Sequence, residues 1–158
     1  MNRFLRLGAV ALLVASAGAA DADCAGPVVG VADGDTLRVV CAGRETTVRL
    51  RDIDAPEWRQ PYGRRARKEL SALVHGRDVQ LEGDELDYYG RLLATVWIDG
   101  INVNREMTRR GYAWAYRRYL RDPALVEDEH EARRERAGLW ADDAPMPPWE
   151  FRPPPRRR

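Results

Sequence analysis

Residues 28–50 read VVGVADGDTLRVVCAGRETTVRL and contain three short runs rich in β-branched side chains, at residues 28–32, 36–40 and 46–50. Asp33-Gly34 separates the first two runs and Ala42-Gly43 separates the last two. Pairs of this kind favour tight turns between strands. The stretch therefore predicts a three-stranded meander at the start of the folded domain.

The chain after this meander changes between helical and strand patterns. Between Pro61 and Gly76, apolar side chains recur at helical spacing, at Tyr62, Ala66, Leu70 and Leu73. Two further strands and two further helices follow, at residues 77–82, 92–98, 102–110 and 122–136. Five strands with a helix between the third and the fourth predict an α+β protein that is mainly β, a five-stranded OB-fold Greek-key barrel with three helices.

Residues 1–22 have the three parts of a secretory signal peptide. Arg3 and Arg6 precede an apolar run at residues 7–15, and small residues surround a plausible cleavage point at residues 20–22. The apolar run is shorter than the roughly 20 residues that a helix needs to cross a bilayer, and no later stretch comes close. We expect a cleaved leader, export to the periplasm or the medium, and no membrane span in the mature chain.

The remaining chain is long enough for one domain with a sizeable core. We place this domain at residues 23–143, followed by a proline- and arginine-rich tail at residues 144–158, and expect a monomer. The whole chain has 26 Lys and Arg against 25 Asp and Glu, and the leader contains two arginines and one aspartate, so the mature chain has no net charge. A generally basic DNA coat is therefore excluded, and a hydrophobic content of 44% excludes a fully disordered chain.

The chain has two cysteines, Cys24 and Cys41. If Asp33-Gly34 forms a two-residue hairpin turn, the two cysteines lie one diagonal step apart across the hairpin, which is within reach of a disulfide. An oxidising compartment favours the bond, and two separate buried thiols are the alternative.

Carboxylates gather in two short segments. Asp33 and Asp35 lie at the expected first turn, and Asp52, Asp54 and Glu57 lie at and beyond the end of the third strand. Alone, the first pair is more often an ordinary turn. Together, carboxylates at strand ends suit a hard cation such as calcium, which accepts oxygen ligands and keeps water molecules where the protein supplies few.

Two arginines are placed near these segments. Arg49 lies on the third strand, and Arg91 begins the fifth strand after an expected turn. The planar guanidinium group binds phosphate in a bidentate manner, although a surface salt bridge is the commoner role for a single arginine. A further basic run lies on the outer face of the first helix, at Arg64, Arg65, Arg67 and Lys68. We interpret this run as a solvated face in preference to a DNA contact.

These motifs, in this order and at this spacing, resemble the thermonuclease or staphylococcal nuclease-like family over roughly residues 27–141. The resemblance is carried by the segments Asp33–Thr36, Arg49–Glu57, Tyr89–Arg91, Gly111–Tyr116 and Gly138–Trp140. It implies an OB-fold barrel that hydrolyses phosphodiester bonds in DNA and RNA with one calcium ion. With the predicted leader, we expect an exported endonuclease.

The resemblance also implies a role for each matching residue. Asp35, Asp54 and the backbone carbonyl of Ala55 would ligate calcium. Glu57 would act on the attacking water, and Arg49 and Arg91 would bind the phosphate. The aromatic side chains that would line the nucleotide pocket are Tyr116 and Tyr119. Only Trp58, Arg59 and Gln60 separate the Pro56-Glu57 motif from Pro61, so the long Lys-rich loop of some members is missing.

Two other classes of protein remain open from the sequence. One is a catalytically inactive OB-fold module that binds nucleic acid or protein, and the other is a structural domain of the cell envelope that adheres through its tail. The inactive OB-fold module is the nearer alternative. Every catalytic position of the family, however, has its matching residue in this sequence.

Overall fold

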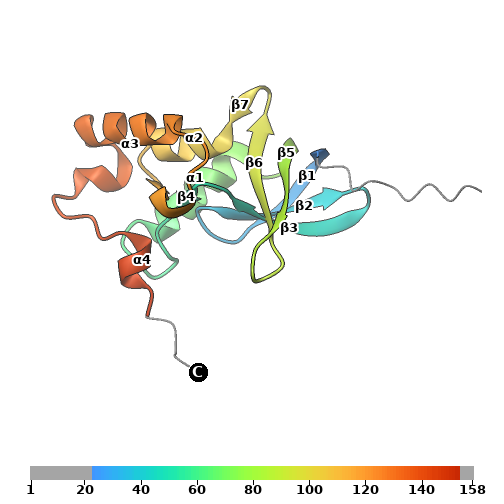
Figure 1. The fold of residues 1–158 in the computed structure, drawn as a ribbon, viewed down its shortest axis with the longest axis horizontal. Coiled ribbons are helices and arrows are strands. Elements are labelled where there is room, and N and C mark those ends of the chain that lie inside the picture. Colours follow the sequence, from blue (N-terminus) through green and yellow to red (C-terminus); the bar gives the residue numbers. More distant parts are fainter. Residues whose placement is uncertain (1–22, 154–158) are drawn as a thin grey trace, which may run out of the picture.

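A computed structural model describes residues 23–153 (Figure 1). The five long strands are β1 (Asp23–Val31), β2 (Thr36–Cys41), β3 (Arg44–Leu50), β5 (Asp78–Leu86) and β6 (Leu92–Ile98). Three short strands are β4 (Ile53–Asp54), β7 (Ile101–Asn102) and β8 (Trp114–Ala115). The helices are α1 (Gly63–Val74), α2 (Val103–Arg109), α3 (Ala124–Arg134) and α4 (Pro148–Phe151), with 3-10 turns at Arg117–Tyr119 and Gly138–Ala141. The leader predicted at residues 1–22 lies outside the described residues.

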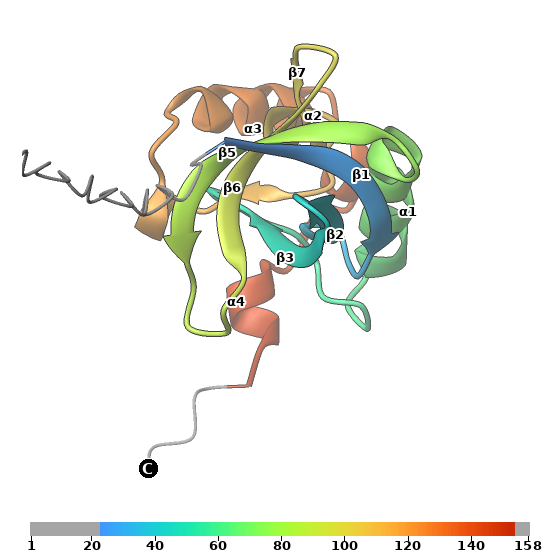
Figure 2. The same cartoon turned by 90° about the vertical axis from the view of Figure 1, so that its right-hand side faces the viewer.

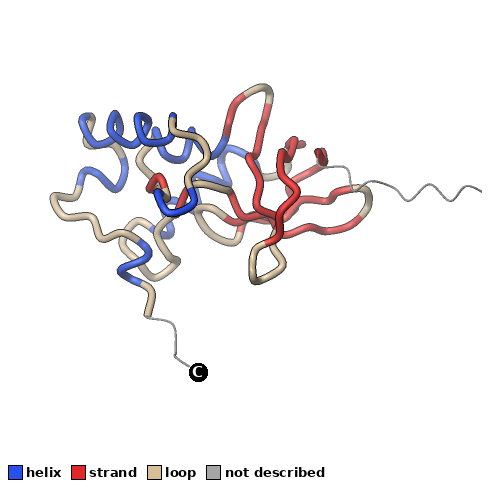
Figure 3. The backbone as a smooth tube through the Cα atoms, viewed as in Figure 1, coloured by secondary structure: helices blue, strands red, loops and turns tan. Residues whose placement is uncertain are grey.

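The five long strands form a closed barrel. They follow the order β3-β2-β1-β5-β6, and a parallel pairing of β3 with β6 closes the circle. Helix α1 connects β3 and β4 to β5, as Figures 1 and 2 show. The predicted mainly β OB fold is confirmed, and the three predicted helices correspond to α1, α2 and α3. Figure 3 shows the long strands gathered on one side of the molecule and the helices on the other.

Strand β1 begins at Asp23, earlier than the predicted start at Val28. The reason is a change of partner along the strand. Residues 23–27 pair with β5, whereas residues 28–31 pair with β2. A bulge between Val28 and Gly30 shifts the register of the pairing with β2. The first half of β1 contains Ala25, Gly26 and Pro27, so it lacks the alternation of apolar and polar residues that would predict a strand.

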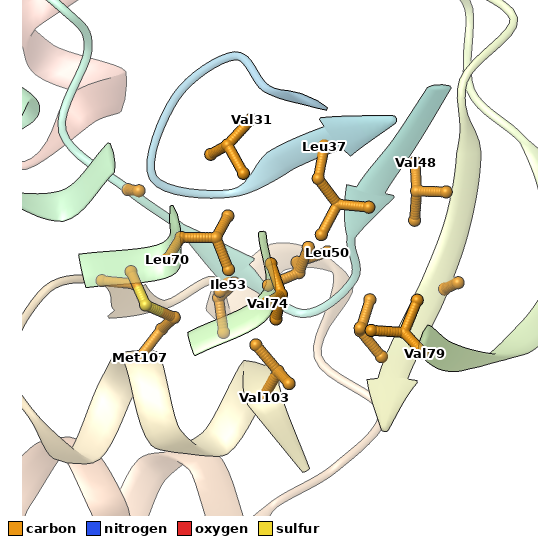
Figure 4. Close-up of a cluster of buried hydrophobic side chains, with 14 of the residues drawn as sticks. Val31, Leu37, Val48, Leu50, Ile53, Leu70, Val74, Val79, Val103 and Met107 are labelled. Carbon is orange, nitrogen blue, oxygen red and sulfur yellow. The ribbon is translucent and has the colours of Figure 1, made fainter. Parts of the chain in front are cut away.

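The barrel interior is filled from each of the five long strands and closed by α1 and α2 (Figure 4). Val48 and Leu50 alternate inward along β3, while Leu70 and Val74 face the barrel from one side of α1. Both helical residues are fully buried. Burial of each such side chain contributes about 1.5–3 kcal/mol, so this core is the main source of stability.

Cys24 and Cys41 form a disulfide with their Cα atoms 5.9 Å apart, which confirms the predicted pairing. The bond joins the beginning of β1 to the end of β2. Among residues 23–153, none of the helices combines the length and the apolar character that a membrane crossing requires.

Candidate active site

The candidate site lies where the loop between β1 and β2 meets the end of β3. Thr36 is the register partner of Arg49, and the Leu50 N–H donates to the Asp35 carbonyl at 2.8 Å. Strand pairing therefore holds Asp35 beside Arg49, because the two residues occupy neighbouring positions across one ladder.

Gly34 lets this loop approach two other elements. A Cβ atom at Gly34 would lie 2.6 Å from the Ala66 Cβ on α1 and 2.7 Å from the Ala55 Cβ after β4. Any larger residue would push the loop outward. The loop that carries Asp35 is thus fixed against the segment that carries Asp54.

Asp35 and Asp54 are only 4% and 0% exposed, and Arg49 bridges them. Its Nη1 lies 3.0 Å from Asp35 Oδ2 and its Nη2 lies 2.9 Å from Asp54 Oδ1. Nη1 also donates to the carbonyls of Leu50 and Ile53, both at 3.0 Å. The structure therefore brings together three of the predicted site residues, with the guanidinium held as counter-ion to both carboxylates.

Burial changes the acidity of two carboxyls in this cluster. It raises the pKa of Asp54, although hydrogen bonding from Arg152 and the charge of Arg49 oppose the shift. Burial and the neighbouring Asp35 raise the pKa of Asp33 to about 7. The sequence places Asp33 in the first carboxylate segment, but the family resemblance implies no role for it. Its carboxylate accepts the Asp35 N–H at 3.1 Å. Sequence alone gives no sign of how deeply this turn is buried.

Glu57 lies just beyond β4, in the connection to α1. Its N–H donates to Gln60 Oε1 at 3.0 Å, and its side chain is 37% exposed. A Cβ atom at Gly63 would lie 1.9 Å from the Glu57 carbonyl oxygen, so the start of α1 packs directly on the Glu57 backbone. The glutamate is therefore held at the edge of the carboxylate cluster.

Arg152, which follows α4, reaches into this cluster from the far end of the chain. Its Nε lies 2.5 Å from Glu57 Oε1, and its Nη1 and Nη2 lie 3.0 and 2.5 Å from the two carboxylate oxygens of Asp54. Burial lowers the pKa of Arg152, but its bonds to Asp54 and Glu57 outweigh this effect and raise the pKa above the usual arginine value. The sequence prediction missed Arg152 because almost a hundred positions separate it from its partners.

Arg91 is held apart from the cluster. Its Nε and Nη2 lie 2.7 and 2.6 Å from Asp87 Oδ2, and its guanidinium lies over the Tyr89 ring at 5.4 Å. Leu93, two residues further on, is the register partner of Arg49. Within residues 23–153 no hydrogen bond or ion pair joins Arg91 to the carboxylate cluster, so strand pairing brings it near without bringing it into contact.

The two predicted aromatic residues follow β8, the strand that pairs with β4. The Tyr116 N–H donates to the Asp52 carbonyl at 2.8 Å, and the preceding residues form β8, which pairs with β4. The rings of Tyr116 and Tyr119 meet edge to face at 5.3 Å. Trp149 of α4 stacks on Tyr116 with centroids 5.6 Å apart and an interplanar angle of 23°. The three rings therefore form one aromatic cluster, in which the indole of Trp149 stacks on Tyr116.

A buried glutamate supports this aromatic flank. Glu129 of α3 has no exposed surface, and its Oε2 accepts the Ala115 N–H at 2.7 Å. Arg117 and Arg133 neutralise its charge. Glu129 therefore fixes β8, and with it the backbone of Tyr116, and helical periodicity alone gave no indication of this role.

The donor set fits a hard cation. Asp35, Asp54 and the Ala55 carbonyl offer only oxygen, and the two buried carboxylates already attract the guanidinium groups of Arg49 and Arg152. In the part of the chain that the structure describes, no group of three or more His, Cys, Asp or Glu side chains is arranged to hold a metal. A cation here would need water or a ligand oxygen to complete its shell.

The chain combines a closed OB barrel with carboxylates and arginines gathered at one edge. This combination is typical of OB-fold nucleases. Comparison with known families agrees: residues 47–142 match the family model described as staphylococcal nuclease homologue. This match covers more than half of the chain.

Individual relatives extend over most of the chain. An uncharacterized endonuclease of Escherichia coli O157:H7 is 45% identical over 132 residues, which cover 83% of this chain and 86% of the relative. Protein ParB of Escherichia coli is 42% identical over 94% of this chain and 90% of its own length, and micrococcal nuclease of Shigella flexneri is 41% identical over 94% and 91%. The chain belongs to the staphylococcal nuclease family, and these relatives support a nuclease function. Nucleases of this family are generally metal-dependent.

Proposed function

We propose that this protein is an exported, calcium-dependent endonuclease that hydrolyses phosphodiester bonds in DNA and RNA. The observation that carries the proposal is the pair of buried carboxylates, Asp35 and Asp54, joined through Arg49 and flanked by Glu57. Family membership supports the reaction class, and the Cys24–Cys41 disulfide supports an oxidising compartment. We assign the catalytic domain to residues 23–143, the tail to residues 144–158 and the leader to residues 1–22, and expect a single elution volume of monomer size in gel filtration.

Calcium held by Asp35, Asp54 and the Ala55 carbonyl would supply positive charge to the phosphate oxygens. Glu57, which lies next to this donor set and has no ligand role of its own, takes a proton from the attacking water. Arg49 and Arg91 bind the non-bridging and leaving oxygens as negative charge develops on them. Tyr116 and Tyr119 stack against the base, which requires no particular sequence.

The substitution Glu57→Gln tests this assignment. Glutamine keeps the size and the hydrogen-bonding capacity of the side chain but cannot accept the water's proton, so cleavage of single-stranded DNA, duplex DNA and RNA should fall at least a hundredfold, about the scale of a general base. Calcium-dependent binding of a nucleotide, measured by calorimetry, should remain. The matched control is Glu69→Gln on α1, whose partner is the remote Arg110.

Three results would contradict the proposal. Cleavage by the native protein in excess chelator would show that the reaction does not need calcium. Unchanged turnover in Glu57→Gln would show that Glu57 is not the base. Nucleic-acid binding without any cleavage by the native protein would favour the non-catalytic OB-fold module instead.

A further inference from the structure

The basic side chains without an acidic partner are concentrated in one short segment. Within residues 23–153, eight Lys and Arg side chains have no carboxylate oxygen within 4.0 Å, and five of the eight are Arg59, Arg64, Arg65, Arg67 and Lys68. The rest of the described surface is largely neutralised by ion pairs. The positive potential of an otherwise balanced chain therefore gathers at the start of α1.

An exposed tryptophan lies within this segment. Trp58 is 46% exposed, and the guanidinium carbons of Arg64 and Arg67 each lie 5.4 Å from its ring centroid. The three side chains border a hollow of about 630 Å³ whose other lining residues are Lys68, Ser71, Ala72 and His75. An aromatic ring interleaved with cations is the usual composition of a surface that binds single-stranded nucleic acid.

The hollow adjoins the candidate active site through two elements. Trp58 directly follows Glu57, and Arg67 Nε donates to the Val31 carbonyl at 3.0 Å, at the end of β1 that leads into the Asp35 loop. A strand whose phosphate lies at Glu57 can therefore continue onto α1 without leaving the protein surface.

We propose that the surface formed by Trp58, Arg64, Arg67 and Lys68 binds the single-stranded nucleic acid that extends beyond the scissile phosphate. A base stacks on the indole or on a guanidinium plane, and the cations bind the neighbouring phosphates. This inference rests on the proposed nuclease function, and it replaces the interpretation of this helix face as simply solvated.

The test compares a strand of about 12 nucleotides with a dinucleotide, both bound in calcium to the Glu57→Gln protein so that neither is consumed. Trp58→Ala and the pair Arg64→Gln/Lys68→Gln should weaken binding of the long strand about tenfold, with a smaller effect on the dinucleotide. The slope of log affinity against log salt should also become shallower by about 0.7 for each phosphate that no longer has a cation beside it. Arg65→Gln is the matched control, because Arg65 lies on the same helix over Tyr62, 5.0 Å from its centroid, and does not line the hollow.

An equal loss in Arg65→Gln, an equal loss for both ligands, or no loss at all would overturn the proposal. Cleavage of the dinucleotide by the native protein separates this failure from failure of the proposed function. If the dinucleotide is cleaved and long-strand binding is unaffected, only the α1 surface is wrong.

A second inference comes from a different part of the chain, residues 146–152, which we name the C-terminal strap. Gln60 Nε2 donates to the Met146 carbonyl at 2.5 Å, and Arg152 binds Asp54 and Glu57. Between them, Trp149 stacks on Tyr116 and meets Trp114 edge to face at 6.4 Å. The guanidinium lies on the carboxylate oxygens that a cation would need, and the indole covers the ring that a base would need.

We infer that the C-terminal strap is an internal competitor that must leave the site before calcium and nucleotide bind. Arg152 donates to both oxygens of the Asp54 carboxylate, at 3.0 and 2.5 Å, and calcium would need the same oxygens as ligands, so the guanidinium and the cation compete for them. The strap is held by few groups, since α4 has only four residues and Trp149 and Phe151 are 41% and 39% exposed. Local opening of so small a unit requires little free energy compared with unfolding of the barrel.

Calorimetry with calcium alone tests this competition. Arg152→Gln should bind calcium about tenfold more tightly than the native chain because the competing charge is gone. The control Arg136→Gln removes an exposed arginine that pairs with Asp143, remote from the carboxylates, and should leave calcium affinity unchanged. In the native chain, amide hydrogen exchange at residues 146–152 should speed up when calcium and nucleotide are added.

Unchanged or weaker calcium binding in Arg152→Gln would overturn the competitor role, and weaker binding would make Arg152 a positioning residue for the carboxylates. Slower exchange of the strap on ligand binding would overturn it as well, because the strap would then close over the ligand instead of leaving.

Discussion

Arg49 combines a structural role with its proposed catalytic one, whereas Arg91 does not. The Arg49 side chain is 11% exposed and neutralises two buried carboxylates, while that of Arg91 is 28% exposed and has one partner. Removal of one partner from a buried ionic cluster leaves an uncompensated charge and costs about 3–5 kcal/mol, but a partly exposed pair contributes about 1 kcal/mol or less.

We therefore expect Arg49→Ala to lower the free energy of unfolding by about 3 kcal/mol, and Arg91→Ala by less than about 1 kcal/mol. Both should lose nuclease turnover by roughly a hundredfold or more, the effect of removing one preorganised donor. Urea denaturation and steady-state kinetics on the same preparations separate the two roles. Equal stability of the two variants would show that Arg49 is not the counter-ion of Asp35 and Asp54.

The pair that holds Arg91 should make stability depend on pH. Burial raises the pKa of Asp87, but hydrogen bonds from the Arg91 guanidinium and from the N–H groups of Arg91 and Tyr89 outweigh it, so the pKa lies below the usual value. The unfolded chain then binds a proton more readily than the native one. This stabilisation is present above about pH 4 and is lost as the pH falls through the lowered pKa.

The difference in unfolding free energy between the native protein and Asp87→Asn should consequently be largest near neutral pH and should shrink on acidification to about pH 3. Urea denaturation at a series of pH values measures this difference. A difference that does not change with pH would mean that Asp87 does not gain its stability as a carboxylate.

At the residue scale, what the sequence could predict depended on distance along the chain. Asp35, Arg49 and Asp54 lie on adjacent turns and strands, so a correct hairpin register brings them together. Arg152 meets Asp54 only after the whole domain has folded, and no local pattern encodes that contact. The partner of Arg91 is four residues away, yet the sequence could not say whether Arg91 faces Asp87 or a phosphate.

At the scale of elements, the disulfide joins the beginning of β1 to the end of β2, across a sequence separation of 17. Closing a loop of this length in the unfolded chain stabilises the native state by about 3 kcal/mol in the chain-entropy account. Neither cysteine contacts the carboxylate cluster.

Reduction, or the double substitution Cys24→Ser/Cys41→Ser, should therefore lower the melting temperature while the turnover of the folded protein stays close to native. Thermal denaturation and nuclease assays at a temperature below both transitions provide the two readouts. A melting temperature that does not respond to reduction would show that β1 and β2 are held by their ladder alone, and a loss of turnover would couple the bond to the site.

The sequence predicted the elements in which apolar residues recur at a regular spacing. Strands β2, β3 and β6 and helix α1 carry apolar residues at regular spacing, and each was placed within a few residues of its observed bounds. The first half of β1, the two-residue strands β4, β7 and β8, and α4 were missed. Their conformation depends on partners distant in sequence, because each is too short or too polar to show a period of its own.

At the scale of the whole molecule, calcium binding and folding should be coupled. The proposed ligands come from the loop after β1, from β4 and from the residue that follows β4. They converge only in the native state, and the unfolded chain has no comparable site. A ligand that binds only the native state raises the free energy of unfolding, by about 2.7 kcal/mol at a hundredfold excess over its dissociation constant.

Calcium should accordingly raise the melting temperature of the native protein by several degrees, on the order of 10 °C for a domain of this size, and a chelator should reverse the shift. Asp54→Asn should abolish the calcium-dependent part of the shift, because it removes one of only two carboxylate ligands, while Asp143→Asn, on the exposed surface, should retain it. Scanning calorimetry with and without calcium measures all three proteins. A full calcium shift in Asp54→Asn would place the cation elsewhere on the molecule, and no shift in the native protein would mean that the carboxylates bind calcium only together with substrate.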